Sequence, residues 1–218
     1  MKERLAGALR GRAGESLEQR NLRNIIWSGA FVGFIDGGIL VYLPVYLARL
    51  GASPAMMGLF SSGQSLLNML LYMPGGAFAE RQRDLVRLVN WSVGLLRVGY
   101  LLIALLPFVL PDSQIPLAAV VIWSLIGGGN AIFWPALLVV IQRAVSPALR
   151  PRAMGGRWAA MTVVAAILIP ILGVVIDNTA FPVGYQFAFV LSFVGAIPNL
   201  YFFSRVRVPD IVRPGGGS

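Results

Sequence analysis

The sequence predicts an all-helical membrane protein, a bundle of six transmembrane helices. Of its 218 residues, 57% are hydrophobic and only 12% are charged, whereas about 25% are charged in an average soluble domain. A soluble fold of this length cannot bury so much apolar side chain, because much of its surface must face water. Six apolar stretches are long enough to cross a bilayer. These observations argue against a soluble enzyme, a nucleic-acid binder and a disordered chain.

Each predicted span has the length of about 20 apolar residues that a helix needs to cross the hydrocarbon core. The first span carries one acid, Asp36, and the third carries Arg97. The fifth has Arg157 at its entrance, and the others are uncharged. The predicted spans cover approximately residues 25–48, 56–79, 88–110, 115–141, 157–176 and 181–203.

The remaining residues form short connections and two tails. Ser53 followed by Pro54 predicts an N-cap and a first helical turn for the second span. Residues 1–24 form a polar, basic N-terminal tail, which lacks the apolar core of a signal peptide. Residues 25–204 form the transmembrane domain. Residues 205–218 end in a glycine-rich run and form a flexible C-terminal tail.

The basic residues gather on one side of the predicted bundle. Nearly all of the 18 lysines and arginines fall in the two tails, in the second connection or in the fourth connection. The connections on the other side carry Asp112 and Asp177, with Arg49 at their edge. Because positive loops stay in the cytoplasm, this bias predicts cytoplasmic termini and a bacterial-type inner (plasma) membrane. The basic tail then contacts anionic lipid, and no nucleic-acid partner is expected.

The missing residue types narrow the chemistry. The chain has no cysteine and no histidine, which removes disulfides, thiolate and imidazole metal sites, and nucleophiles that depend on them. Its one lysine, Lys2, is not part of a phosphate-binding loop. The sequence therefore predicts a protein that is not an enzyme and has no metal and no cofactor.

Several motifs resemble the N-terminal half of a major facilitator superfamily transporter. Residues 75–83 read GGAFAERQR, which is similar to that family's cytoplasmic loop, G-x-x-x-D-R-x-G-R-R. Glu80 stands in place of the usual aspartate, and Arg83 in place of a glycine. Glycines 127–129 with Trp134 in the fourth span, and Pro170 to Gly173 in the fifth, extend the resemblance over roughly residues 25–205.

The resemblance implies a six-helix, 3+3 repeat body that forms one half of a carrier. Such a half implies a partner across the substrate path, which is a second six-helix half, a second copy or another membrane subunit. The implied function is movement of an unknown small solute by alternating access, with proton or ion coupling left open. The alternative is a non-transporting scaffold or accessory subunit of a larger membrane complex.

Asp36 and Arg97 are the leading candidates for a substrate or ion site. Asp36 lies about 16 Å into the first span, where a charged carboxylate costs at least about 2.5 kcal/mol and needs a partner, water or a proton. The alternatives are a structural ion pair and an acid at a helix break beside Gly37 and Gly38. Arg97 lies at similar depth, where it would pair with Asp36, bind an anionic group or serve packing.

Further candidates are uncharged polar or aromatic residues within the spans. Gln64 and Asn68 share a helix face, while Asn130 and Trp134 lie in the span that the resemblance assigns to the substrate path. Hydrogen bonding between helices is the alternative role.

The resemblance also implies a gating loop at the cytoplasmic end of the second span. Gly76, Glu80 and Arg81 are its candidate residues. In the resembled family this loop contacts the other half in one state of the transport cycle. The alternative is that these charges only set the orientation of the chain in the membrane.

Overall fold

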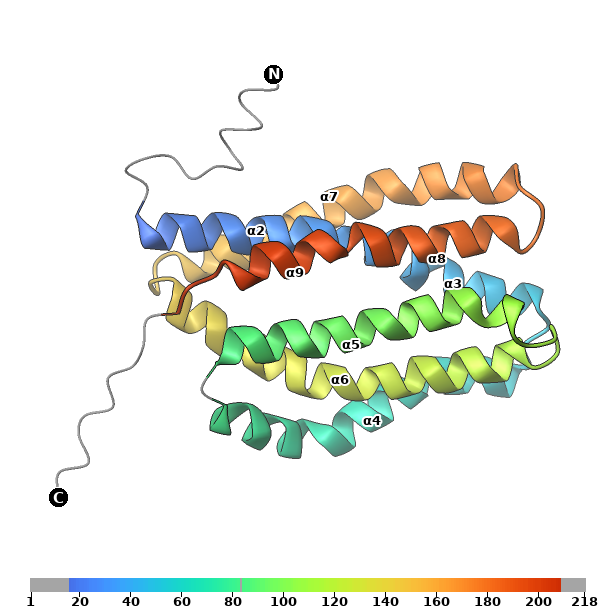
Figure 1. Cartoon of the computed structure of the whole chain (residues 1–218), viewed down its shortest axis with the longest axis horizontal. Coiled ribbons are helices and arrows are strands. Elements are labelled where there is room, and N and C mark those ends of the chain that lie inside the picture. The colour runs from blue at the N-terminus through green and yellow to red at the C-terminus, as the bar shows by residue number, and fades with distance from the viewer. Residues whose placement is uncertain (1–15, 83, 209–218) are drawn as a thin grey trace.

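The structure, a computed structural model, describes residues 16–82 and 84–208, and all regular secondary structure within them is helical (Figure 1). Residues 1–15 and 209–218 of the predicted tails lie outside the described residues, as does Arg83. The elements are α2 Leu17–Asp36, α3 Ile39–Arg49, α4 Pro54–Arg81, α5 Leu85–Leu105, the 3-10 turn η1 Leu106–Phe108, α6 Ile115–Ala144, α7 Arg150–Asp177, α8 Val183–Gly195 and α9 Ile197–Ser204.

Five segments of the described chain are long and apolar enough to cross a membrane. They are Leu17–Arg49, Leu85–Phe108, Ile115–Ala144, Arg150–Asp177 and Val183–Ser204. The helix that matches the second predicted span, α4, has 28 residues but is not among them. Serines, Gln64 and Asn68 make its middle more polar. An all-helical membrane protein is thus confirmed, while a crossing by α4 and a 3+3 repeat stay predictions.

Side-chain caps fix where several helices begin. Ser16 accepts a hydrogen bond from the Gln19 N–H at 3.3 Å and caps α2, which therefore starts well before residue 25. The predicted cap at Ser53 is confirmed, because Ser53 accepts from the Met56 N–H at 3.3 Å and α4 begins at Pro54.

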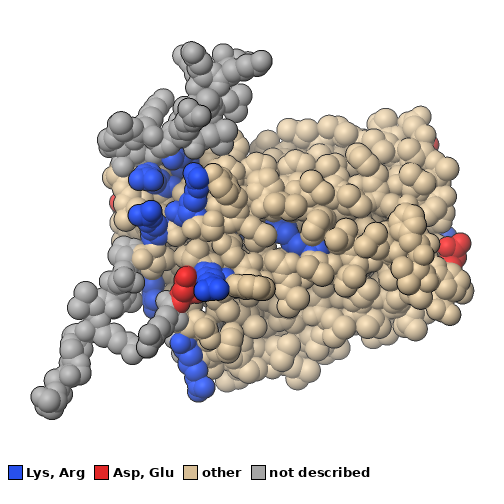
Figure 2. All heavy atoms as spheres, in the orientation of Figure 1, with Lys and Arg blue, Asp and Glu red and all other residues tan. Residues whose placement is uncertain are grey.

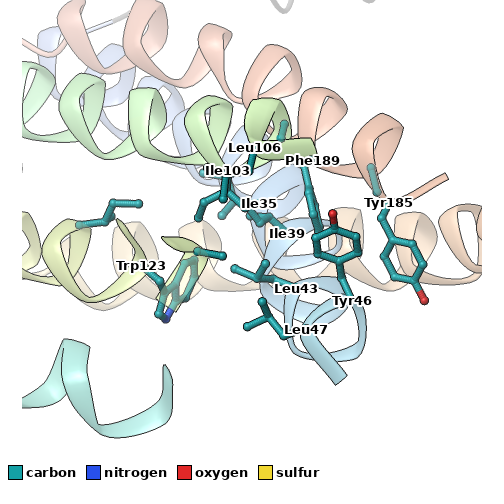
Figure 3. Close-up of a cluster of buried hydrophobic side chains, with 14 of the residues drawn as sticks. Ile35, Ile39, Leu43, Tyr46, Leu47, Ile103, Leu106, Trp123, Tyr185 and Phe189 are labelled. Atoms are coloured by element: carbon teal, nitrogen blue, oxygen red, sulfur yellow. The ribbon is translucent and has the colours of Figure 1, made fainter. Parts of the chain in front are cut away.

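The helices associate in two groups that do not follow the order of the chain. In Figure 1, α2, α7, α8 and α9 lie together, and α4, α5 and α6 form the other part of the bundle. The contacts of α5 with α8 and α9 join the groups. Two hydrophobic clusters fill the interior, one around Ile39, Tyr46 and Phe189 (Figure 3) and one around Ile25 and Val140. The polar centre described below lies between them.

One end of the bundle is rich in arginine, as Figure 2 shows; we call it the basic end. Helices α2, α5 and α7 begin there, and α4, α6 and α9 end there. Asn21 is buried at this end and donates from Nδ2 to the carbonyls of Ala144 and Arg207, at 2.8 Å each. Asn21 Oδ1 accepts from the Arg207 N–H at 3.0 Å. These bonds tie the first turns of α2 to the end of α6 and to the segment that follows α9.

Glycines let α2 and α7 pack with their backbones close together. Gly29 and Gly33 of α2 and the C-cap Gly37 are spaced four residues apart, and a Cβ at each would lie 2.5–2.9 Å from backbone or side-chain atoms of α7. The contacts advance in the same direction along both helices, from Arg157 through Met161 to Ala165 on α7, so the two helices run parallel. Close approach through small residues is a common way for helices to associate in a membrane.

We expect Gly33→Ala to destabilise the fold by about 1–3 kcal/mol, because the new Cβ overpacks this interface. It would lie 2.5 Å from the Met161 carbonyl oxygen and 2.7 Å from Val164 Cβ. The thermal midpoint of unfolding in detergent measures the effect. Gly58→Ala is the matched control, since its Cβ meets no atom within 4 Å. Equal midpoints for the two variants would refute the proposed role of this interface.

Candidate functional site

A network of hydrogen bonds crosses the middle of the bundle and joins four helices. Arg97 on α5 donates from Nη2 to Asn199 Oδ1 on α9 at 2.7 Å. Asn199 donates from Nδ2 to the Ser28 carbonyl on α2 at 2.8 Å. Arg157 on α7 donates from Nη1 to Ser28 Oγ, also at 2.8 Å. All four residues are buried. The network therefore holds two guanidinium groups inside the bundle.

The charges at this centre are not balanced. Arg97 and Arg157 are only 3% and 6% exposed. The half-buried Asp36 interacts electrostatically with Arg157, and Arg97 interacts electrostatically with Arg157 as well. Arg97 Nε and Nη1 are buried and have no hydrogen-bond partner in the described chain. Unpaired charge in an apolar interior costs several kcal/mol. A binding site for a polar solute is one arrangement that explains such a cost.

Basic side chains are visible at mid-length of the molecule as well as at the basic end. Figure 2 shows basic side chains at mid-length, set back in a hollow between α5 and the α8–α9 segment. This hollow is separate from the basic end.

The first span is broken beside Asp36. Helix α2 ends at Asp36, and α3 begins at Ile39 after Gly37 and Gly38. The Ile39 N–H donates to Ser192 Oγ at 2.9 Å, which fixes the break against α8. A Cβ on Gly38 would collide with Ser192 Oγ, so glycine is required there. The acid stands at the C-terminal end of a half-helix, where the backbone dipole favours a cation or a proton near it.

Asp36 and Arg97 both interact electrostatically with Arg157, but they do not bind each other directly. Within residues 16–82 and 84–208, no hydrogen bond or ion pair links their side chains. Arg157 is the cation that interacts with Asp36. The roles of Asp36 and Arg97 in binding stay predictions.

The other polar candidates lie outside this network. Gln64 packs against Gly127 in the contact between α4 and α6, and Asn68 Oδ1 is buried with no partner in the described chain. Asn130 is half-buried on α6. The Trp134 ring stacks on Trp158 of α7, with centroids 6.3 Å apart and planes at 9°. Helix α6 continues through Pro135 without a break.

The candidate gating residues lie at the last turns of α4, at the basic end. Gly76 is half-buried and Arg81 is exposed. Glu80 belongs to the helix, and its side chain is outside the described part of the chain. Their gating role stays a prediction.

Sequence reasoning missed Ser28, Arg157 and Asn199. The sequence placed Arg157 at the entrance of the fifth span, whereas α7 begins at Arg150 and Arg157 is buried nearly two turns inside this helix. Pro151 was an available signal, since proline favours the first turn of a helix. An amide in an apolar span was the signal for Asn199. Ser28 gave none, because its partners come from distant helices.

Comparison with known proteins gives one result. The family model described as "Major Facilitator Superfamily" matches residues 25–217. No curated protein and no solved structure gives a significant match.

Proposed function

This chain belongs to the major facilitator superfamily of membrane transporters, and from that premise we propose that it is one six-helix half of a secondary transporter. It moves a small solute across the membrane by alternating access. The solute or a coupling ion is bound near Asp36, Arg97 and Arg157.

One observation carries the proposal: an incompletely neutralised charge centre stands beside a broken helix at mid-bundle. Transporters often place substrate and ion sites at such interrupted helices, near the middle of the membrane. Asp36 at the end of α2 is suited to a proton or a cation. The unpartnered nitrogens of Arg97 are suited to an anionic or carbonyl oxygen. A solute with such an oxygen would complete the centre.

The exposed faces of α4 and α7 support a second body across the path. On α4, Met69, Leu70 and Met73 are exposed, and among the described side chains of this helix Phe60 is the large hydrophobic one that is buried. On α7, Val163 and Ile167 are likewise exposed. The second body is a six-helix half, another copy of this chain or another membrane subunit. The basic end faces the cytoplasm of a bacterial-type inner membrane, in line with the positive-inside rule.

A single cysteine at Ser65 tests the proposal. Ser65 is exposed at mid-depth on α4, and the chain has no native cysteine, so a membrane-impermeant maleimide reports on that position alone. We expect Ser65→Cys to be labelled in vesicles, and the side of access to shift when a solute binds, because thiolates form in water. Leu102→Cys on the exposed face of α5 is the matched control and should stay unlabelled.

Each outcome separates the two functional classes. Labelling of Ser65→Cys from both sides, in proportions that change with a bound solute, supports alternating access. Protection of Ser65→Cys from both sides, equal to that of Leu102→Cys, would mean that lipid or a fixed subunit covers α4. That result would favour the non-transporting scaffold.

A further inference from the structure

A groove of about 1340 Å³ opens on the surface of the bundle. It lies between the first half of α5 and the last turn of α9, near the basic end. Arg87 and Arg143 line its rim, and Leu95, Val98 and Leu200 line its apolar part. The groove therefore runs from a charged mouth to an apolar channel along a helix apolar enough to cross the membrane.

The aromatic residues place the mouth at the membrane surface. Trp91 and Tyr201 line the groove and are 71% and 52% exposed. The Arg205 guanidinium carbon lies 4.2 Å from the centre of the Tyr201 ring. Tryptophan and tyrosine concentrate at the level of lipid headgroups. The part of the groove below them, toward Val98, then faces acyl chains.

The polar groups at the mouth select the kind of headgroup. Arg87 and Arg143 are exposed, and the one acid of the lining, Asp84, already accepts the Arg87 N–H through Oδ1 at 2.9 Å as the cap of α5. Asn90 also lines the groove, and its Oδ1 is buried behind that lining with no hydrogen-bond partner in the described chain. Two guanidinium groups suit a phosphate, and a lone amide oxygen suits a hydroxyl donor.

We propose that this groove is a binding site for one anionic phospholipid with a hydroxylated headgroup, of which phosphatidylglycerol is the simplest. Arg87 and Arg143 hold the phosphate, Asn90 accepts from a headgroup hydroxyl, and one acyl chain lies along Leu95 and Val98. The lining of the groove shares no residue with the central network, and Val98 and Leu200 are the chain neighbours of Arg97 and Asn199.

Gly94 offers a way to close the apolar part without disturbing the fold. It lines the groove on α5, and a Cβ built there meets no atom within 4 Å. A leucine at this position therefore fills the space meant for the acyl chain. It also replaces a glycine inside a helix, which favours the helical state.

The test is native mass spectrometry of the full chain, released from detergent and titrated with dioleoyl-phosphatidylglycerol or dioleoyl-phosphatidylcholine. We expect one phosphatidylglycerol to bind more tightly than phosphatidylcholine. The double variant Arg87→Gln/Arg143→Gln should weaken phosphatidylglycerol binding about thirtyfold, since each arginine near an anionic lipid contributes a factor of about five. Gly94→Leu should weaken the binding of both lipids.

The matched control removes two arginines elsewhere on the exposed surface, as Arg20→Gln/Arg152→Gln. We expect it to bind phosphatidylglycerol as the unmodified chain does. An equal loss in the control would show that only the total charge matters, and would overturn the site. Unchanged binding in Arg87→Gln/Arg143→Gln, with an unchanged thermal midpoint, would overturn it as well.

Discussion

Replacing Asp36 with asparagine is expected to lower solute transport below about 1% of the unmodified rate, which corresponds to at least about 2.7 kcal/mol of barrier height. The side chain keeps its shape but loses the charge that faces Arg157 and the ability to carry a proton or hold a cation. The helix break at Gly37 and Gly38 remains, so the chain still inserts and folds. Uptake into proteoliposomes is the measurement, with a compound chosen because it raises the thermal midpoint of the purified chain.

Asp177→Asn is the control for this experiment. Asp177 is an exposed acid at the end of α7, far from the basic end, and its loss changes the net charge by the same amount. We expect transport by this control to be unaffected. Undiminished uptake in Asp36→Asn would remove Asp36 from the site, even if the family assignment is correct.

Arg157→Met is expected to destabilise the fold by about 3 kcal/mol, because it removes the cation that compensates a partly buried acid. It also leaves Ser28 Oγ without the guanidinium donor that lies 2.8 Å away. For a chain of this size the thermal midpoint should fall by roughly 6–12 °C. Unfolding in detergent micelles, followed by circular dichroism, gives the midpoint.

Arg97→Met is the informative comparison. Both arginines are buried, but Arg157 interacts with the acid Asp36, whereas Arg97 is bonded to the neutral amide of Asn199. Within the described residues, Arg97 makes one hydrogen bond, to Asn199, and leaves Nε and Nη1 unsatisfied. Replacing a poorly satisfied buried charge with an apolar side chain is often neutral or stabilising. We expect a midpoint within a few degrees of the unmodified chain, together with reduced transport. Equal destabilisation by Arg97→Met and Arg157→Met would contradict this account of the charge centre.

Local features of the fold were predictable from the sequence. The cap at Ser53 and the start of α6 at Ile115 depend on residues close in the chain and were predicted where the structure has them. The start of α7 was not, because the residues from Arg150 to Gly156 are polar or small and read as a loop. Hydropathy marks where a helix is apolar, whereas the helix itself continues for as long as its backbone is hydrogen-bonded.

The central site was predictable only in part. Asp36 and Arg97 stand out because a charge in an apolar stretch is costly wherever it lies. The roles of Ser28 and Asn199 depend on partners more than 100 positions away in the sequence. Arg157 donates to Ser28 across a separation of 129 residues, and Asn199 donates to the Ser28 carbonyl across 171 residues. Those contacts depend on how α2, α7 and α9 pack. A residue pattern within one helix does not contain that information.

The grouping of the helices also determines the order in which they can pack while the chain is being synthesised. The ribosome makes α2 well before its neighbours α7 and α9, whereas α4, α5 and α6 are made consecutively and contact one another. The glycines of α2 and the side chain of Asp36 therefore lack their partner helices until α7 and α9 have been synthesised. During that interval, lipid or the insertion machinery must cover the face of α2 that later packs against α7.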